Sequence, residues 1–144
     1  MNTKVYVACP MNPCFRESEE RVVRVLRQRG YNVYFPAEFK VPDAWSFPNS
    51  SWAKTVFEKD MEELHASDIV ILLYFGQETA TGSIWEAGYA YGTGKKLILV
   101  EMLGGIKDSL MIFNSAYAVL QGEKEIERYD LINGERRFTN TEQI

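Results

Sequence analysis

The chain has 144 residues, 46% of them apolar and 25% charged, with a formal net charge of −4 and a pI of about 5.1. This length predicts a single domain over residues 1–144 with a core that needs no disulfide or metal. Acidic and basic residues are interleaved, which disfavours nucleic acid as a partner. No apolar run approaches the ~18 residues that span a bilayer, so no membrane partner is expected.

The N-terminus and the cysteines indicate the compartment. The first residues lead directly into a strand pattern without a secretory apolar region, so we expect a cytoplasmic protein. Cys9 and Cys14 are the only cysteines, and they have neither a second pair nor a histidine cluster beside them. The sequence therefore predicts no disulfide framework, no metal site and no cofactor.

Strand and helix patterns alternate through the first half of the chain. A β-branched run at residues 4–9 predicts a strand, and apolar spacing from Ser18 to Arg29, with Gly30 just beyond, predicts a helix. Residues 31–35 predict a second strand. A long loop at 37–51 follows, whose aromatic side chains Trp45 and Phe47 suggest a lid or a binding wall.

The second half repeats the alternation. A helix is expected over residues 52–66, and the nearly continuous apolar run at 67–75 is typical of a parallel strand buried on both faces. Residues 83–92 predict a helix and 97–103 another buried strand, after which the pattern continues more weakly through 109–120. This order predicts an α/β fold: a flavodoxin-like or Rossmann-like doubly wound parallel sheet in a three-layer α/β/α sandwich.

In such sheets ligands bind beyond the carboxyl ends of the strands, which directs attention to the loops at 9–16, 75–85 and 101–111. Glu86, just after the second of these loops, has two interpretations. Ser83 and Glu86 fit a capping box, in which the glutamate bonds back to the start of its helix. Alternatively, the helix N-terminus holds Glu86 ionised and directs it at a ligand.

A second carboxylate favours the functional interpretation. Asp60 falls near the apolar side of its helix with Val56, Phe57, Met61 and Leu64, where an unpaired charge is costly. An acid that simply reaches solvent at the edge of this stripe is the alternative. If Asp60 points toward Glu86, the two carboxylates provide a nucleophile and a proton donor for retaining glycosidic cleavage.

The segments at 68–70, 82–90 (GSIWEAGYA) and 94–96 (GKK) together resemble the nucleoside 2-deoxyribosyltransferase family, which has related 2'-deoxynucleoside 5'-monophosphate N-glycosidases. The resemblance covers nearly the whole chain except about the last 15 residues. It implies that Glu86 is the nucleophile, that Tyr6 hydrogen-bonds and orients it, and that Asp60 lies near the base. From the residues alone, Tyr6 is equally compatible with plain sheet packing.

The resemblance also implies partners. Ser109 and Met111 fall on a segment that a neighbouring subunit contributes to the sugar pocket in the family, so a homo-oligomer, a dimer or an assembly of dimers, is expected. The implied substrates are a nucleoside or nucleotide and a free nucleobase. The sugar would be transferred from a 2'-deoxyribonucleoside to another base or to water.

Two departures from the family pattern bear on the substrate. Ala80 stands where the family has an aspartate for the sugar 5'-hydroxyl, and Ser109 stands where the transferases have asparagine. Without that negative charge, Ser109 and the backbone N–H groups of Gly82 and Ser83 would suit a 5'-phosphate. A 5'-monophosphate N-glycosidase is therefore the alternative function, and a non-catalytic nucleotide-binding module is a further one.

Overall fold

The computed structural model describes residues 3–40, 49–76, 81–103 and 109–138. Helices and strands alternate along the chain: β1 (Lys4–Ala8), η1 (Pro13–Phe15), α1 (Arg16–Gln28), β2 (Asn32–Tyr34), η2 (Pro36–Glu38), α2 (Asn49–Ala66), β3 (Ile69–Tyr74), α3 (Thr81–Gly92), β4 (Lys96–Glu101), α4 (Leu110–Ser115), β5 (Ala118–Gln121), α5 (Gly122–Arg128) and β6 (Arg137–Phe138). The η elements are short 3₁₀ helices.

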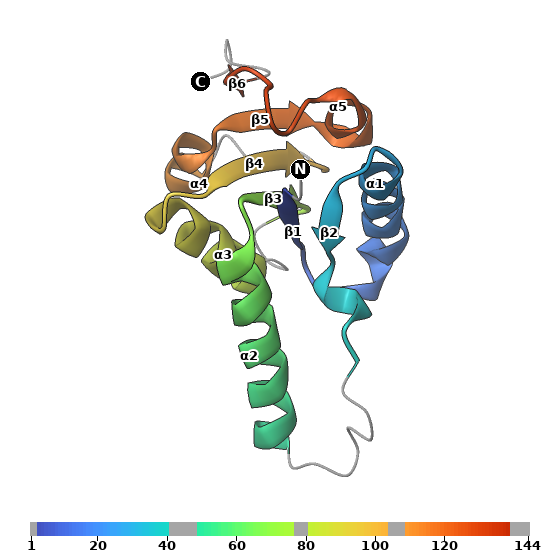
Figure 1. The fold of residues 1–144 in the computed structure, drawn as a ribbon, viewed down its shortest axis with the longest axis vertical. Coiled ribbons are helices and arrows are strands. Elements are labelled where there is room, and N and C mark those ends of the chain that lie inside the picture. The colour runs from blue at the N-terminus through green and yellow to red at the C-terminus, as the bar shows by residue number, and fades with distance from the viewer. Residues whose placement is uncertain (1–2, 41–48, 77–80, 104–108, 139–144) are drawn as a thin grey trace.

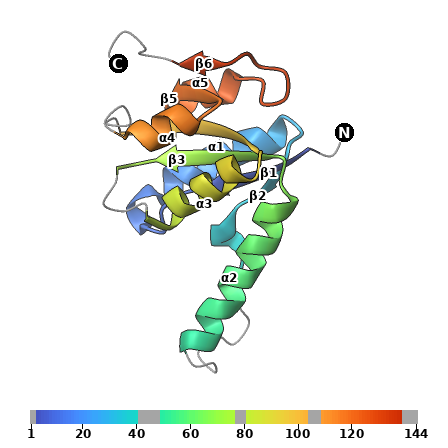
Figure 2. The same ribbon diagram turned by 90° about the vertical axis from the view of Figure 1, so that its left-hand side faces the viewer.

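The strands form one sheet in the order β2-β1-β3-β4-β5-β6, and every neighbouring pair is parallel. Helices cover both faces: α1 and α5 lie on one side, and α2, α3 and α4 on the other (Figure 1). The turned view in Figure 2 shows α2 extending beyond the sheet. This arrangement confirms the predicted doubly wound three-layer fold.

Two apolar cores hold the layers together, one on each face of the sheet. Alternate residues of β1 face opposite sides, so Val5 and Val7 pack toward α1 while Tyr6 and Ala8 pack toward α2, α3 and α4. The central strand β3 has all six residues buried, as its continuous apolar sequence predicts. Gly94 has a φ of +78° in the turn between α3 and β4, a conformation that favours glycine.

Several boundaries and elements differ from the sequence-based expectations. The helices α1, α2 and α3 each begin two or three residues earlier than predicted. The C-terminal helix α5 and strand β6 were not predicted, and β6 consists of two residues that pair with β5. The aromatic loop residues Trp45 and Phe47 lie outside the described residues, so the expected lid is not tested. None of the helices in the described ranges is long and apolar enough to cross a membrane.

The direction in which strands are added to the sheet reverses after β2, and the switch point lies between β1 and β3. β2 lies on one side of β1, and β3 with all later strands lies on the other. Loops that leave such a pair of strands diverge to opposite faces and open a crevice at the carboxyl edge of the sheet. This edge contains the candidate site.

Candidate active site

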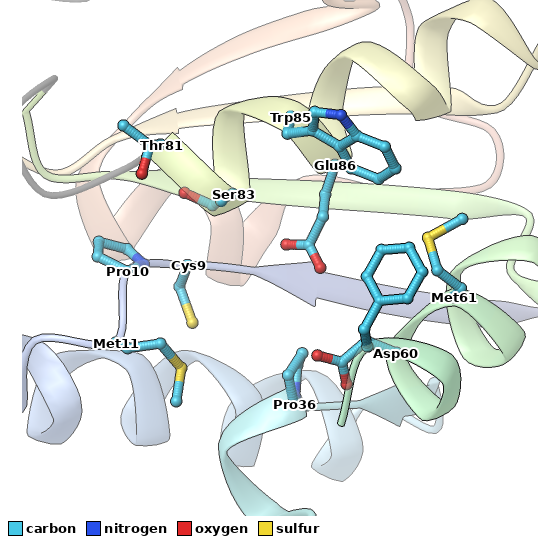
Figure 3. Close-up of a pocket in the computed structure, with 12 residues that line it drawn as sticks. Cys9, Pro10, Met11, Pro36, Asp60, Met61, Thr81, Ser83, Trp85 and Glu86 are labelled. Atoms are coloured by element: carbon cyan, nitrogen blue, oxygen red, sulfur yellow. The ribbon is translucent and has the colours of Figure 1, made fainter. Parts of the chain in front are cut away.

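A cavity of about 440 Å³ lies at this crevice, within the size range of small-molecule sites. Its walls come from the segment after β1, the first residue of η2, one face of α2 and the first two turns of α3. The residues that line it are Cys9, Pro10, Met11, Pro36, Phe57, Asp60, Met61, Thr81, Gly82, Ser83, Trp85 and Glu86. Figure 3 shows the carboxylates of Asp60 and Glu86 directed into this same cavity.

Glu86 is held by Tyr6. The tyrosine is fully buried in β1, and its hydroxyl donates a short hydrogen bond to Glu86 Oε2. The contact that the family resemblance implies is thus present, and it explains how a buried tyrosine in a sheet core satisfies its hydroxyl. Burial and the neighbouring carboxylate Glu86 together raise the pKa of Tyr6 well above its usual value, so Tyr6 remains a donor.

The protonation of Glu86 differs from the expectation that the helix N-terminus keeps it ionised. Burial raises the pKa of Glu86 to about 7, and the negative charge of Asp60 adds to this effect. The hydrogen bond from Tyr6 favours the carboxylate and opposes the rise in pKa. Desolvation therefore outweighs the hydrogen bond from Tyr6, and the carboxyl group changes its charge near neutral pH.

The capping-box interpretation of Ser83 and Glu86 is wrong. Helix α3 begins at Thr81, so Ser83 lies inside the first turn and is buried rather than placed at the cap. Glu86 is in the second turn, and its carboxylate bonds to Tyr6 on a neighbouring strand instead of reaching back along its own helix. The side chain is thus directed into the cavity, as a role in binding or catalysis requires.

Asp60 is half-buried on the cavity face of α2 and does not reach solvent freely. The hydroxyl of Tyr34, at the end of β2, donates a 2.9 Å hydrogen bond to Asp60 Oδ1. Burial raises the pKa of Asp60, while the bond from Tyr34 and the charge of Lys59 act in the opposite direction. The expectation that Asp60 lies toward Glu86 is confirmed, since both line the cavity and the charge of Asp60 raises the pKa of Glu86.

Aromatic side chains form one wall of the cavity. Phe57 of α2 and Trp85 of α3 have ring centroids 6.4 Å apart, and Trp85 stacks on Tyr89 at 6.0 Å. Phe57 and Trp85 are more than half exposed, which is unusual for large apolar side chains beside a cavity. A flat aromatic group, such as a nucleobase, would bury this surface.

Of the other site residues predicted from the sequence, some line the cavity and others do not. Gly82 and Ser83 line the cavity at the start of α3. Met111 does not: it is 84% exposed on α4, beside a separate apolar hollow between α3 and α4. Ser109 immediately precedes α4, and it is likewise not among the residues that line the cavity of Glu86. Ala80 lies outside the described residues.

Sequence reasoning missed Tyr34 and the aromatic wall. Tyr34 stands in the second strand, where an isolated tyrosine is usually sheet packing, and its partner Asp60 is 26 residues away. The only available signal was that Tyr34 lies in a predicted strand, where its hydroxyl group needs a hydrogen-bond partner that the sequence does not identify. Trp85 is part of the motif that carries the resemblance, but its exposure is evident only in the structure.

Two carboxylates in unlike surroundings within one cavity are the groups with which enzymes break glycosidic bonds. The model of the family described as nucleoside 2-deoxyribosyltransferase matches residues 5–109. The chain belongs to the nucleoside 2-deoxyribosyltransferase family. This membership makes it an enzyme of the glycosyl transferase or N-glycosidase kind, acting on nucleosides or nucleotides and nucleobases.

Solved structures agree with this family. A 2-deoxyribosyltransferase from the psychrotolerant bacterium Bacillus psychrosaccharolyticus is 29% identical, with a TM-score of 0.85 over 94% of this chain and 98% of that one. Two further structures, below 25% identity, share the fold. A conserved protein from Enterococcus faecalis V583 has 19% identity and a TM-score of 0.69 over 89% of this chain and 99% of its own. The Clostridium botulinum CMP N-glycosidase BcmB has 21% identity and a TM-score of 0.57 over 88% and 96%. No curated protein sequence matches the chain.

Proposed function

We propose that this protein cleaves the N-glycosidic bond of 2'-deoxyribonucleosides through a covalent deoxyribosyl ester on Glu86, and transfers the sugar to another nucleobase or to water. The observation that carries the proposal is the hydrogen bond from the buried Tyr6 to Glu86 Oε2 at the cavity. This bond holds one carboxylate oxygen and leaves Oε1 for attack on the anomeric carbon.

In the first step, Glu86 Oε1 forms a bond to C1' of the sugar while the bond from C1' to the base nitrogen breaks. The electron pair of the broken bond remains on the base, and the Asp60 carboxyl group gives the base a proton. In the second step, a nitrogen of the acceptor base or a water oxygen attacks C1' and gives its proton to the Asp60 carboxylate. The bond from C1' to Glu86 Oε1 breaks, which releases the Glu86 carboxylate and restores the acid form of Asp60. Two displacements at one carbon retain its configuration.

The environment of the two acids supports these roles. A carboxyl group whose pKa is about 7 is ionised in roughly half of the molecules at neutral pH, and a partly buried carboxylate is a less solvated nucleophile. Asp60 has a raised pKa because of burial, as a proton donor needs. Phe57 of the aromatic wall projects from the same helix as Asp60, α2, so a base that packs on Phe57 lies on the side of its proton source.

The test is a panel of deoxynucleosides with and without a second base, followed by product chromatography. We expect base exchange in wild type and a loss of at least ~10³-fold in turnover for Glu86→Gln, which keeps the shape but lacks the charged nucleophile. Near-wild-type turnover in Glu86→Gln contradicts the covalent mechanism. Absence of cleavage with every substrate in wild type favours a nucleotide-binding module.

A 5'-monophosphate N-glycosidase is the second candidate, favoured by the start of α3. Thr81, Gly82 and Ser83 line the end of the cavity at the N-terminus of this helix, where backbone N–H groups suit an anion. The absence of an aspartate at position 80 removes a charge that would repel phosphate. The ratio of kcat/KM for a deoxynucleoside and its 5'-monophosphate, in wild type and Ala80→Asp, tests this candidate. A tenfold preference of wild type for the free nucleoside, or a ratio that Ala80→Asp leaves unmoved, contradicts it.

We further propose that the enzyme is a homo-oligomer. Tyr91 of α3 and Leu110 and Met111 of α4 are 61%, 72% and 84% exposed, and they border the apolar hollow between these helices. Exposed apolar surface of this kind is typical of a contact between subunits. A second copy of the chain on this surface would agree with the family resemblance, in which the segment of Ser109 and Met111 completes the pocket of a neighbour.

A further inference from the structure

Two tyrosines on neighbouring strands each serve one of the cavity carboxylates. In the parallel register of β1 and β2, Tyr6 is the direct partner of Tyr34. Both side chains therefore extend from the same face of the sheet, and their ring centroids are 5.5 Å apart. Tyr6 donates to Glu86, and Tyr34 donates to Asp60.

The hydroxyl of Tyr34 has no role in packing. Its ring lies against the core on the α2 and α3 side, which a phenylalanine would fill equally well. The hydroxyl instead joins the end of β2 to Asp60 on α2 through one 2.9 Å bond to Oδ1. With Oδ1 held in this way, the second oxygen of Asp60 is available for a ligand in the cavity.

We propose that Tyr34 is a positioning residue: by holding Oδ1 of Asp60, it directs Oδ2 toward the departing nucleobase. This inference rests on the proposed function, in which Asp60 supplies the proton. It gives the matched tyrosines of β1 and β2 distinct tasks, since Tyr6 orients the nucleophile and Tyr34 orients the acid.

Charged and titratable groups around Asp60 determine the sign of the expected effect. They are Tyr34 from β2, Tyr6 from β1, Lys59 beside Asp60 on α2, and Glu86 from α3 across the cavity. Lys59 also lies over the ring of Tyr34, with its Nζ 5.8 Å from the centroid. The bond from Tyr34 stabilises the charged form of Asp60, so its loss raises the pKa of Asp60.

The first arm of the test measures this pKa without any substrate. Carbon-13 NMR of aspartate-labelled protein follows each carboxyl group through a pH titration, and Asp60→Asn identifies the signal of Asp60. We expect a higher pKa of Asp60 in Tyr34→Phe than in wild type. The matched control is Tyr117→Phe, which loses a hydroxyl bonded to the Gly134 carbonyl at 3.1 Å, away from the cavity, and leaves the titration unchanged.

The second arm is a double-mutant cycle measured on deoxynucleosides. Tyr34→Phe should lower kcat for an ordinary nucleoside by about tenfold or more, as expected for a lost bond to a charged group. It should have no further effect in Asp60→Asn, nor with a nucleoside whose base departs without protonation. An unchanged pKa of Asp60, or an equal loss in both backgrounds, overturns the role of Tyr34. Wild type that cleaves no nucleoside overturns the proposed function instead, so the two failures are distinct.

Discussion

The raised pKa of Glu86 makes a prediction about folding that needs no substrate. A carboxyl group of pKa 4.5 in the unfolded chain and about 7 in the folded protein binds protons more tightly when folded. Its contribution to stability is therefore fully present below pH 4.5 and is lost as the pH rises through 7. At about 1.4 kcal/mol per pH unit, this difference in pKa corresponds to about 3 kcal/mol.

Glu86→Gln removes this titration while nearly preserving the side-chain shape. We expect the free energy of unfolding of wild type to fall by about 3 kcal/mol relative to Glu86→Gln between pH 4 and pH 8. Asp60 titrates in both proteins, so its contribution largely cancels in the comparison. The assay is urea unfolding at several pH values, with the exposed glutamate variant Glu58→Gln as the control for a charge lost at the surface.

A parallel pH dependence in wild type and Glu86→Gln would refute this reasoning. It would mean that burial does not disfavour the charged form of Glu86, and that the hydrogen bond from Tyr6 fully compensates for desolvation. A rise in the free energy of unfolding of wild type relative to Glu86→Gln as the pH increases would show that the folded protein stabilises the charged form of Glu86.

Three further predictions concern activity and assembly. Asp60→Asn should leave kcat nearly unchanged for substrates whose base departs without protonation and lower it strongly for ordinary nucleosides. Equal losses in kcat on both kinds of substrate would contradict the role of Asp60 as the acid. Tyr6→Phe removes a hydrogen bond that lowers the pKa of Glu86. With an activated substrate, the acidic limb of the pH–rate profile should therefore move to higher pH by about one to two units. A limb that does not move would contradict the pairing of Tyr6 with Glu86. Met111→Glu should reduce the oligomer in sedimentation measurements and lower activity together with it, whereas an unchanged mass would count against the proposed contact.

The fold was predictable because the sequence patterns that indicate it extend over long stretches of the chain. The apolar run of β3 needs helices on both of its faces, and the alternation of strands and helices around it leaves few topologies. Strand β6 was not predictable, since two residues that pair with an edge strand carry no periodic pattern. The early start of α3 was missed because Ser83 resembles a cap residue, although it lies buried in the first turn.

The candidate site was predictable as a set of residues but not in its electrostatics. Asp60 was identified because a charge next to apolar side chains requires a reason, and Glu86 because it follows a loop at the carboxyl end of a buried strand and matches the family motif. The pKa of Glu86 depends on how deeply the folded protein covers it, which no local pattern contains. The bond from Tyr34 to Asp60 depends on the register of β1 and β2 and on the packing of α2 against the sheet.

The central claim is that Glu86 becomes covalently bonded to the sugar, and intact-protein mass spectrometry tests it most directly. Protein is mixed with a deoxynucleoside, quenched in acid within the first turnovers and weighed, and a peptide digest then locates any added group. The account predicts an added mass of one deoxyribosyl group on the peptide that contains Glu86, and none in Glu86→Gln under the same conditions. Base release by wild type with no adduct at any quench time, or an adduct that persists in Glu86→Gln, would contradict it.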